Sequence, residues 1–73
     1  EALFVELVKV LFAQRRKTIF NNLRAGRTRL GLIDDAVITA TLAAAQLDPR
    51  RRAETLTLNE AGQLADLISA LHL

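Results

Sequence analysis

The stretch ALFVELVKVLFA, residues 2–13, decides the fold. Ten of its twelve side chains are apolar, and only Glu6 and Lys9 interrupt them. A surface helix normally shows one apolar stripe opposite a polar face, but a helix over 2–14 would be apolar nearly all round. Such a helix needs cover on more than one side. It is either the central helix of this domain or a helix whose second partner lies outside this sequence.

The middle of the chain predicts two more helices. A short one covers 17–24 and ends at Gly26, which we expect in the left-handed conformation that closes helices. The segment 27–33 is expected to be a basic connector. Asp34 or Asp35 then starts the next helix, because a carboxylate caps free backbone amides and suits the positive helix end. Asp48-Pro49 stops that helix, since the residue before proline avoids the helical region.

The last third of the chain predicts a basic turn over 49–56 and a final helix. Thr57 with Glu60 three residues later has the pattern of a capping box. Residues at helical spacing form its apolar face: Leu58, Ala61, Leu64, Ala65, Ile68 and Leu71. Nothing indicates a strand, so we expect an all-α fold, a small bundle of about four helices. The expected core packs one set of side chains against another: Phe4, Leu7, Val8, Leu11 and Phe12 against Leu64, Ile68 and Leu71.

Length and composition limit the functions that the chain could have. With 73 residues the chain forms one small helical domain over 1–73. It has no cysteine and a single histidine, His72, so thiol chemistry, disulfides and a metal site are not expected. No apolar stretch is long enough to cross a bilayer, and we expect a cytoplasmic protein without a membrane partner. The first residue, Glu1, opens mid-helix without methionine, which indicates a fragment of a longer protein.

The cations are strongly clustered although the net charge is only +2. Eight of the ten are arginines, whose planar forks bind phosphate in bidentate fashion. Two clusters on one small domain indicate a phosphate-backbone footprint, and the alternative is a solvated face with a few ion pairs. Nine cations fall in the two groups: Arg15, Arg16, Lys17, Arg24, Arg27 and Arg29 in the first, and Arg50, Arg51 and Arg52 in the second.

Catalysis by this chain is not expected. It contains no glycine-rich phosphate loop and no nucleophile with a histidine partner. The pair Asp34-Asp35 is typical of a helix start rather than of an acid–base couple. Phe20 is the one aromatic residue that we expect to be exposed, so stacking on single strands has little support. Recognition of structured RNA by its backbone and shape fits better.

Two motifs carry a family resemblance. Residues 12–23, FAQRRKTIFNNL, closely resemble the pattern F-x-Q-R-R-K-T-[LI]-x-N-N-L, and residues 46–60 resemble G-I-D-P-x-x-R-[AP]-E-x-L-S-x-E-x. Both patterns belong to the C-terminal domain of the small-subunit rRNA adenine dimethyltransferases, the KsgA family. The likeness extends over about residues 4–71. Gln46 departs from the pattern, because it stands where relatives have glycine, so we expect that helix end to close differently.

The resemblance implies a parent enzyme that uses S-adenosylmethionine to dimethylate N6 of two adjacent adenosines in small-subunit rRNA during ribosome biogenesis. Its catalytic Rossmann-like N-terminal domain is absent from this sequence. The chain would then be the C-terminal domain that engages the small-subunit rRNA of the 30S precursor. By itself it is expected to have no catalytic, cofactor-binding or metal-binding residues.

The expected RNA-binding residues are cations of the two motifs. Arg15 and Arg16 have a second interpretation, because either one could pair with Glu54 and so hold the domain together. Two other functions stay open: a free-standing nucleic-acid-binding module of helix-turn-helix type, and a protein-interaction bundle that uses the apolar helix over 2–14. The full RNA-binding set is Lys17, Arg24, Arg50, Arg51, Arg52, Arg15 and Arg16.

Overall fold

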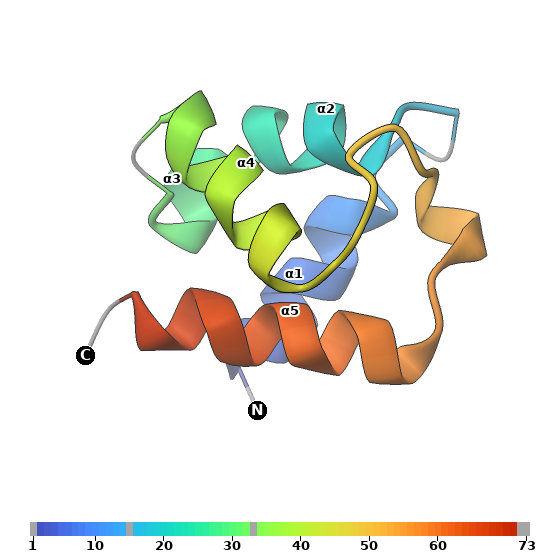
Figure 1. Ribbon diagram of the computed structural model, residues 1–73. Coiled ribbons are helices and arrows are strands. Elements are labelled where there is room, and N and C mark those ends of the chain that lie inside the picture. The colour runs from blue at the N-terminus through green and yellow to red at the C-terminus, as the bar shows by residue number, and fades with distance from the viewer. Residues whose placement is uncertain (1, 15, 33, 72–73) are drawn as a thin grey trace.

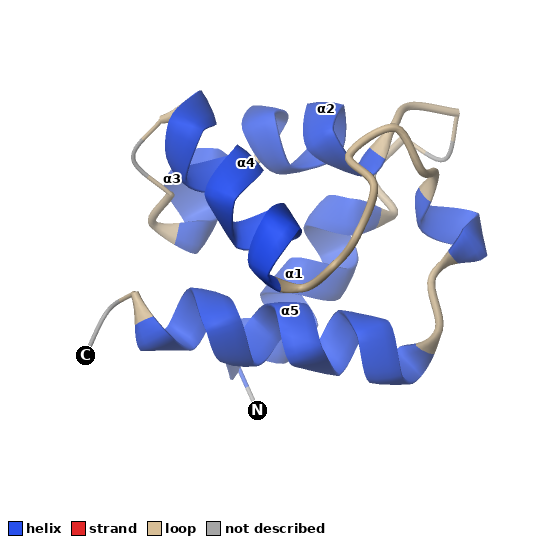
Figure 2. Cartoon of the chain, in the orientation of Figure 1, coloured by secondary structure: helices blue, strands red, loops and turns tan. Residues whose placement is uncertain are grey.

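A computed structural model describes residues 2–14, 16–32 and 34–71, and all regular structure in these ranges is helical (Figure 1). The all-α expectation is confirmed, and no strand occurs in the described part of the chain (Figure 2). One helix more than expected is present, because four residues of the supposed connector form a helical turn. The elements are α1 (Ala2–Leu11), α2 (Ile19–Ala25), α3 (Arg27–Leu30), α4 (Asp35–Ala44), the 3-10 turn η1 (Ala53–Thr55) and α5 (Leu58–Ala70).

Side-chain caps fix where three of the helices begin. The hydroxyl of Thr18 and the carboxylate of Asp34 each accept a backbone N–H three residues further on. At the start of α5 the Thr57 hydroxyl accepts the N–H of Glu60 at 3.1 Å, and the Glu60 carboxylate accepts the N–H of Thr57 at 2.9 Å. The predicted capping box is therefore confirmed. The second helix begins at Ile19 and not at Lys17, because Thr18 caps it.

Gly26 joins α2 to α3 for a reason other than the expected one. Its φ of −100° lies outside the left-handed region, so that expectation is wrong. A Cβ atom built on Gly26 would lie 2.7 Å from both methyl carbons of Val10 on α1. Glycine is therefore needed here because α1 passes very close to the joint. The left-handed closing glycine is Gly31, with φ 72°, at the end of α3.

The end of α4 corrects a second expectation. The helix ends at Ala44, several residues before the Asp48-Pro49 pair that was expected to stop it. Gln46 has a φ of 59°, and the N–H of Leu47 bonds back to the carbonyl of Leu42 at 2.9 Å. This position thus adopts the left-handed conformation that glycine usually supplies. The helix closes in the ordinary way although its residue differs from the motif.

The core lies among α1, α2, α4 and α5: both α2 and α5 pack against α1 and α4, and α3 packs against α1 and α2 (Figure 1). Helix α1 contacts α2, α3 and α5, so it is the central helix of the domain. Two of the five core residues expected on this helix are confirmed, since Leu7 and Leu11 are fully buried. The other fully buried large side chains are Ile19, Leu23, Leu30, Ile38, Leu42, Leu64 and Ile68.

The core predicted from the sequence included residues at the helix ends that are in fact exposed. Phe12 is 43% exposed, because α1 ends at Leu11 and the chain then turns away. Leu58 and Leu71 are 80% and 51% exposed, since one stands in the first turn of α5 and the other follows its last residue. Phe4 and Val8 are half-buried. Helical spacing therefore predicted the buried face correctly but not the points where the helices stop.

Candidate nucleic-acid interface

Two stretches that are far apart in the sequence lie side by side at one edge of the domain. Thr18 and Arg52 form an isolated antiparallel bridge. The N–H of Ile19 donates to the carbonyl of Arg51 at 2.7 Å, and that of Phe20 to the carbonyl of Pro49 at 3.2 Å. The segment before α2 and the segment before η1 are thereby joined through their backbones. The two cation clusters of the sequence thus meet in the fold.

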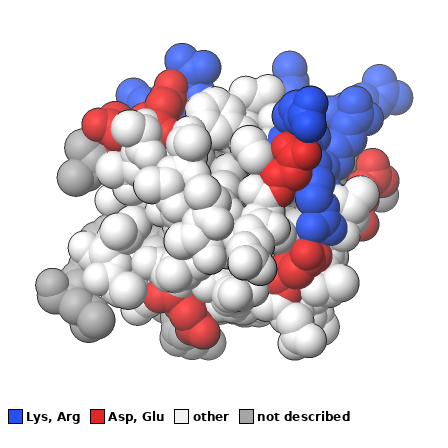
Figure 3. Space-filling view, viewed as in Figure 1, with Lys and Arg blue, Asp and Glu red and all other residues white. Residues whose placement is uncertain are grey.

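We call the exposed cations at this junction the basic edge, defined as Arg16, Lys17, Arg50 and Arg52. Blue atoms gather along the right and upper right of the molecule with some red atoms beside them, and a smaller blue group lies at the upper left, while the surface in the middle of this view carries almost no charge (Figure 3). Within the described residues, Arg16, Lys17 and Arg52 have no ion-pair partner. Three positive charges are therefore available to an external anion here.

Arg50 shares this edge but has an acid beside it. Its guanidinium contacts both carboxylate oxygens of Asp48, through Nε at 3.3 Å and through an outer nitrogen at 3.2 Å. These hydrogen bonds lower the pKa of Asp48 and raise that of Arg50. The Arg50 side chain is nevertheless 87% exposed, so solvent screens the pair and the outer face of the guanidinium is accessible.

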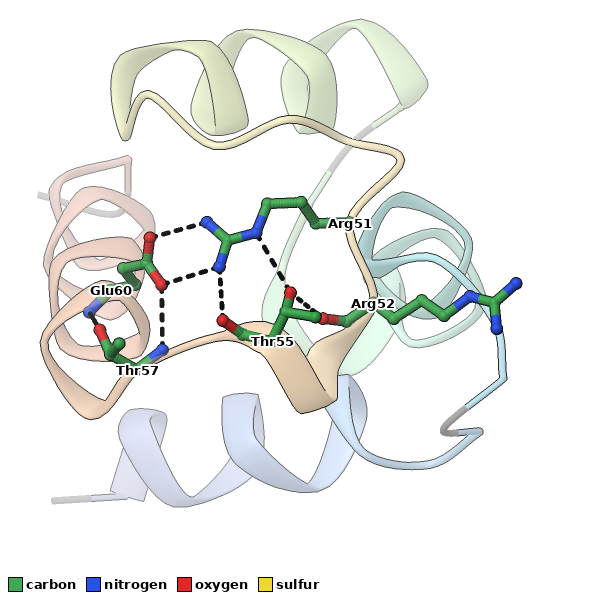
Figure 4. Close-up of polar contacts among 5 residues, drawn as sticks. All are labelled: Arg51, Arg52, Thr55, Thr57 and Glu60. Atoms are coloured by element: carbon green, nitrogen blue, oxygen red, sulfur yellow. Dashed lines mark hydrogen bonds and ion pairs between the residues drawn. The ribbon is translucent and has the colours of Figure 1, made fainter.

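Arg51 points the opposite way from Arg52 (Figure 4). Its two outer nitrogens contact the Glu60 carboxylate at 2.7 and 3.1 Å, and its Nε donates to the Thr55 hydroxyl at 3.1 Å. It also donates to the Thr55 carbonyl. The contacts with Glu60 tie the segment before η1 to the start of α5, and those with Thr55 tie it to the last residue of η1. The geometry therefore gives Arg51 a bracing role inside the domain, which its neighbours do not share.

Glu60 has two partners at once, Arg51 and the N–H of Thr57. The hydrogen bond from Arg51, followed by that from Thr57, lowers the pKa of Glu60 from 4.5 to about 2. The charged carboxylate is thus the form that the fold prefers. One acid closes the cap of α5 and holds the preceding segment against it.

Acid is expected to weaken the fold through this carboxylate. Because the pKa of Glu60 is depressed in the folded state, its contribution is complete above about pH 4.5 and is lost as the pH falls toward about 2. Urea unfolding followed by circular dichroism between pH 7 and pH 2 measures the effect. In a Glu60→Gln variant the loss of stability over this range should be smaller. Glu54→Gln, the same change at an exposed acid in the same segment, should retain the parent slope, and an equal slope in all three proteins would contradict the assignment.

The remaining cations of the first cluster lie beside two acids elsewhere on the domain. Arg24 and Arg27 lie 3.4 and 3.6 Å from the carboxylate oxygens of Asp35, and Arg29 lies 2.9 Å from Glu6. Arg24 was predicted to bind RNA, and the structure places it with this paired group and not at the basic edge. The charge of the first cluster is therefore divided between an unpaired part and a part that acids offset only in part, because Arg24 and Arg27 share Asp35 and Arg29 shares Glu6 with Lys9.

The expected pairing with Glu54 is not seen for Arg16. Among the described residues Arg16 forms no ion pair, and Glu54 has none either. Arg15, the other residue for which this role was considered, lies outside the described residues. Of the two interpretations, exposure of Arg16 to solvent favours an external partner over a bracing role.

The structural role of Asn22 was not predicted from the sequence. It is 3% exposed, and its side-chain amide donates to the carbonyls of Leu11 and Gln14 at 2.8 and 3.0 Å. It therefore satisfies the open end of α1 and fixes the turn that leads to Arg16 and Lys17.

No group of three or more His, Cys, Asp or Glu side chains that could hold a metal occurs in the described part of the chain. None of the helices described is both long and apolar enough to span a membrane. The described residues form a small all-α domain with three unpaired cations along one edge.

Curated relatives cover nearly the whole chain. It is 50% identical over 66 residues to the ribosomal RNA small subunit methyltransferase A of Lysinibacillus sphaericus, a match over 90% of this chain and 22% of the relative. The protein of that name from Syntrophotalea carbinolica is 51% identical over 89% of the chain and 23% of the relative, and that from Desulforapulum autotrophicum 38% over 99% and 24%. No family model and no solved structure matches.

The resemblance carried by the two sequence motifs is thereby confirmed. The chain is homologous to one segment of the small-subunit rRNA methyltransferase A family. It spans less than a quarter of the length of these curated relatives.

Proposed function

We propose that this domain is the rRNA-contacting C-terminal domain of an S-adenosylmethionine-dependent small-subunit rRNA (adenine-N6,N6)-dimethyltransferase. The names of the relatives support the enzyme class. The observation that carries the RNA contact is the backbone bridge between Thr18 and Arg52, because it assembles unpaired cations from two distant stretches at one edge.

In this proposal the rest of the protein supplies the chemistry. A catalytic N-terminal domain binds S-adenosylmethionine and dimethylates two adjacent adenosines in the cytoplasm, and the domain described here does neither by itself. Its partners are the small-subunit rRNA of the 30S precursor and that catalytic domain. A helix-turn-helix function has less support, because α4 and α5, which are long enough to enter a groove as a recognition helix, contain no lysine or arginine.

The predicted RNA-binding residues contribute unequally in this proposal. Arg16, Lys17 and Arg52 provide the main phosphate contacts, because their charges are unpaired within the described residues. Arg50 adds a fourth contact from its exposed face. Exposed cations on a rigid backbone bind phosphates without reading sequence, so structured RNAs of different sequence should bind alike. Arg51 and Arg24 serve the fold first, through Glu60 and Asp35.

Salt dependence tests this proposal. Each neutralised phosphate contributes about −0.9 to the slope of log K against log salt on a DNA duplex and about −0.7 on single strands. Replacing Arg16, Lys17 and Arg52 together with alanine should therefore make the slope on a paired RNA hairpin shallower by about 2 to 3 units. Fluorescence anisotropy at several salt concentrations measures it.

A variant with the same loss of charge provides the control. Lys9, Arg27 and Arg29 lie beside Glu6 or Asp35, so replacing these three with alanine should change the slope much less. Both variants should remain folded, as far-ultraviolet circular dichroism will show. Equal slopes for the parent and the basic-edge variant would refute the proposed phosphate contacts.

A further inference from the structure

A hollow of about 430 Å³ lies directly beside the basic edge. It is formed where α2, α4 and the segment before η1 meet. Thr18 in its wall follows Lys17 in the chain, and Arg50 in its wall is two residues from Arg52, so the hollow and the cations share the same two backbone segments. The residues that line it are Thr18, Phe20, Asn21, Thr39, Pro49 and Arg50.

The wall of this hollow combines an apolar surface with a few polar groups. Phe20 is half-buried and packs against the core with part of its surface, so its ring is held in place while the rest lines the hollow. Pro49 is exposed beside it. The side-chain amide of Asn21 makes no hydrogen bond to any described residue, and it offers both a donor and an acceptor.

These features suit one flat, polar-edged ring. Aromatic side chains and arginine guanidinium planes stack on nucleobases, and asparagine pairs with their hydrogen-bonding edges. The volume lies within the range of small-ligand pockets. A second apolar hollow, between Val37 on α4 and Leu67 on α5, contains no charged residue, and nothing in the structure indicates what would cover it.

We propose that the hollow at Phe20 binds a single unpaired nucleobase of the RNA whose phosphates lie along the basic edge. The inference rests on the proposed function and deepens it, because it adds recognition of an extruded base to recognition of the backbone. The base would stack on the Phe20 ring beside Pro49, with its polar edge toward Asn21 and its phosphate toward the Arg50–Arg52 side. The domain would then prefer RNA with a bulge or open loop over a continuous duplex.

Two RNA hairpins test this inference. One is fully paired, and the other has the same stem with a single bulged 2-aminopurine, whose fluorescence falls when it stacks. The parent domain should bind the bulged hairpin about tenfold more tightly, which corresponds to about 1.4 kcal/mol and lies within the range for one stacked base. The fluorescence of the bulged 2-aminopurine should fall when the domain binds.

Phe20→Leu keeps an apolar side chain but removes the aromatic ring, and Asn21→Ala removes the free amide. Both variants should lose most of the preference for the bulged hairpin while their salt slope remains that of the parent and circular dichroism shows that both are folded. Asn59→Ala, the same change at an exposed position on α5, should retain the preference.

Equal affinity of the parent for the two hairpins, or an undiminished preference in both variants, would overturn the inference and leave the proposed phosphate contacts intact. Failure to bind either hairpin would instead overturn the proposed function, and the inference with it.

Discussion

Replacing Leu11 with alanine is expected to destabilise the domain by about 2–5 kcal/mol. Leu11 has no exposed surface and lies on the face of α1 that packs into the core. Truncation would leave a cavity that α5 and α2 cannot both move to fill. Small domains have a total stability near the lower end of about 5–15 kcal/mol, so much of the protein should be unfolded at 37 °C. Urea and thermal unfolding followed by circular dichroism measure the change.

The neighbouring residue provides a matched control. Phe12 is larger than Leu11 but 43% exposed, because it lies in the turn after α1. Phe12→Ala should therefore cost about 1 kcal/mol, far less than the 3–5 kcal/mol that a fully buried phenylalanine would cost. If Phe12→Ala proved as destabilising as Leu11→Ala, Phe12 would have to be buried, which would contradict the end of α1 at Leu11.

The second large effect is expected at Asn22. Alanine at this position would leave the buried carbonyl of Leu11 without its donor, and a buried acceptor left unpaired costs about 1–3 kcal/mol. The carbonyl of Gln14 would lose one of two donors, because it also accepts the N–H of Lys17 at 3.0 Å. The turn before Arg16 and Lys17 would also lose its support. The stability measured by urea unfolding and the RNA affinity measured at low temperature should both fall, since the affected turn leads into the basic edge.

Two further variants make this result specific. Asn22→Asp keeps the shape but replaces the donating amide with acceptor oxygens that face two carbonyls, so it should be at least as destabilising as Asn22→Ala. Asn21→Ala changes the exposed neighbour and should melt like the parent. A stable Asn22→Asp protein would show that the amide is not the important group.

Features governed by neighbouring residues were predictable from the sequence. Asp34 and the Thr57–Glu60 box act within one helical turn, so their patterns give the correct helix starts. Helix α3 was missed because its four residues lie between two glycines and carry two exposed arginines, which is typical of a loop. Phe12 and Leu71 were misplaced because periodicity continues past the residues where the helices end.

The candidate site depended on contacts that no local pattern encodes. The sequence showed two clusters of cations, but the bridge from Thr18 to Arg52 is a tertiary contact. The inward turn of Arg51 depends on Glu60 lying across the loop, which the run of three identical arginines cannot indicate. Thr18 could have been recognised as a helix cap, since a threonine stands directly before the apolar Ile19.

The bridge between Thr18 and Arg52 also means that folding, and not RNA binding, brings the cations together. Bringing two distant stretches of chain together has an entropic cost, and packing of the core offsets this cost during folding, before any ligand binds. RNA would then meet charges that are already in register, and binding need not order them. A peptide copied from residues 14–22, or from 49–56, would carry the same charge without that advantage. The binding surface in this proposal is thus a property of the folded domain and not of either motif by itself.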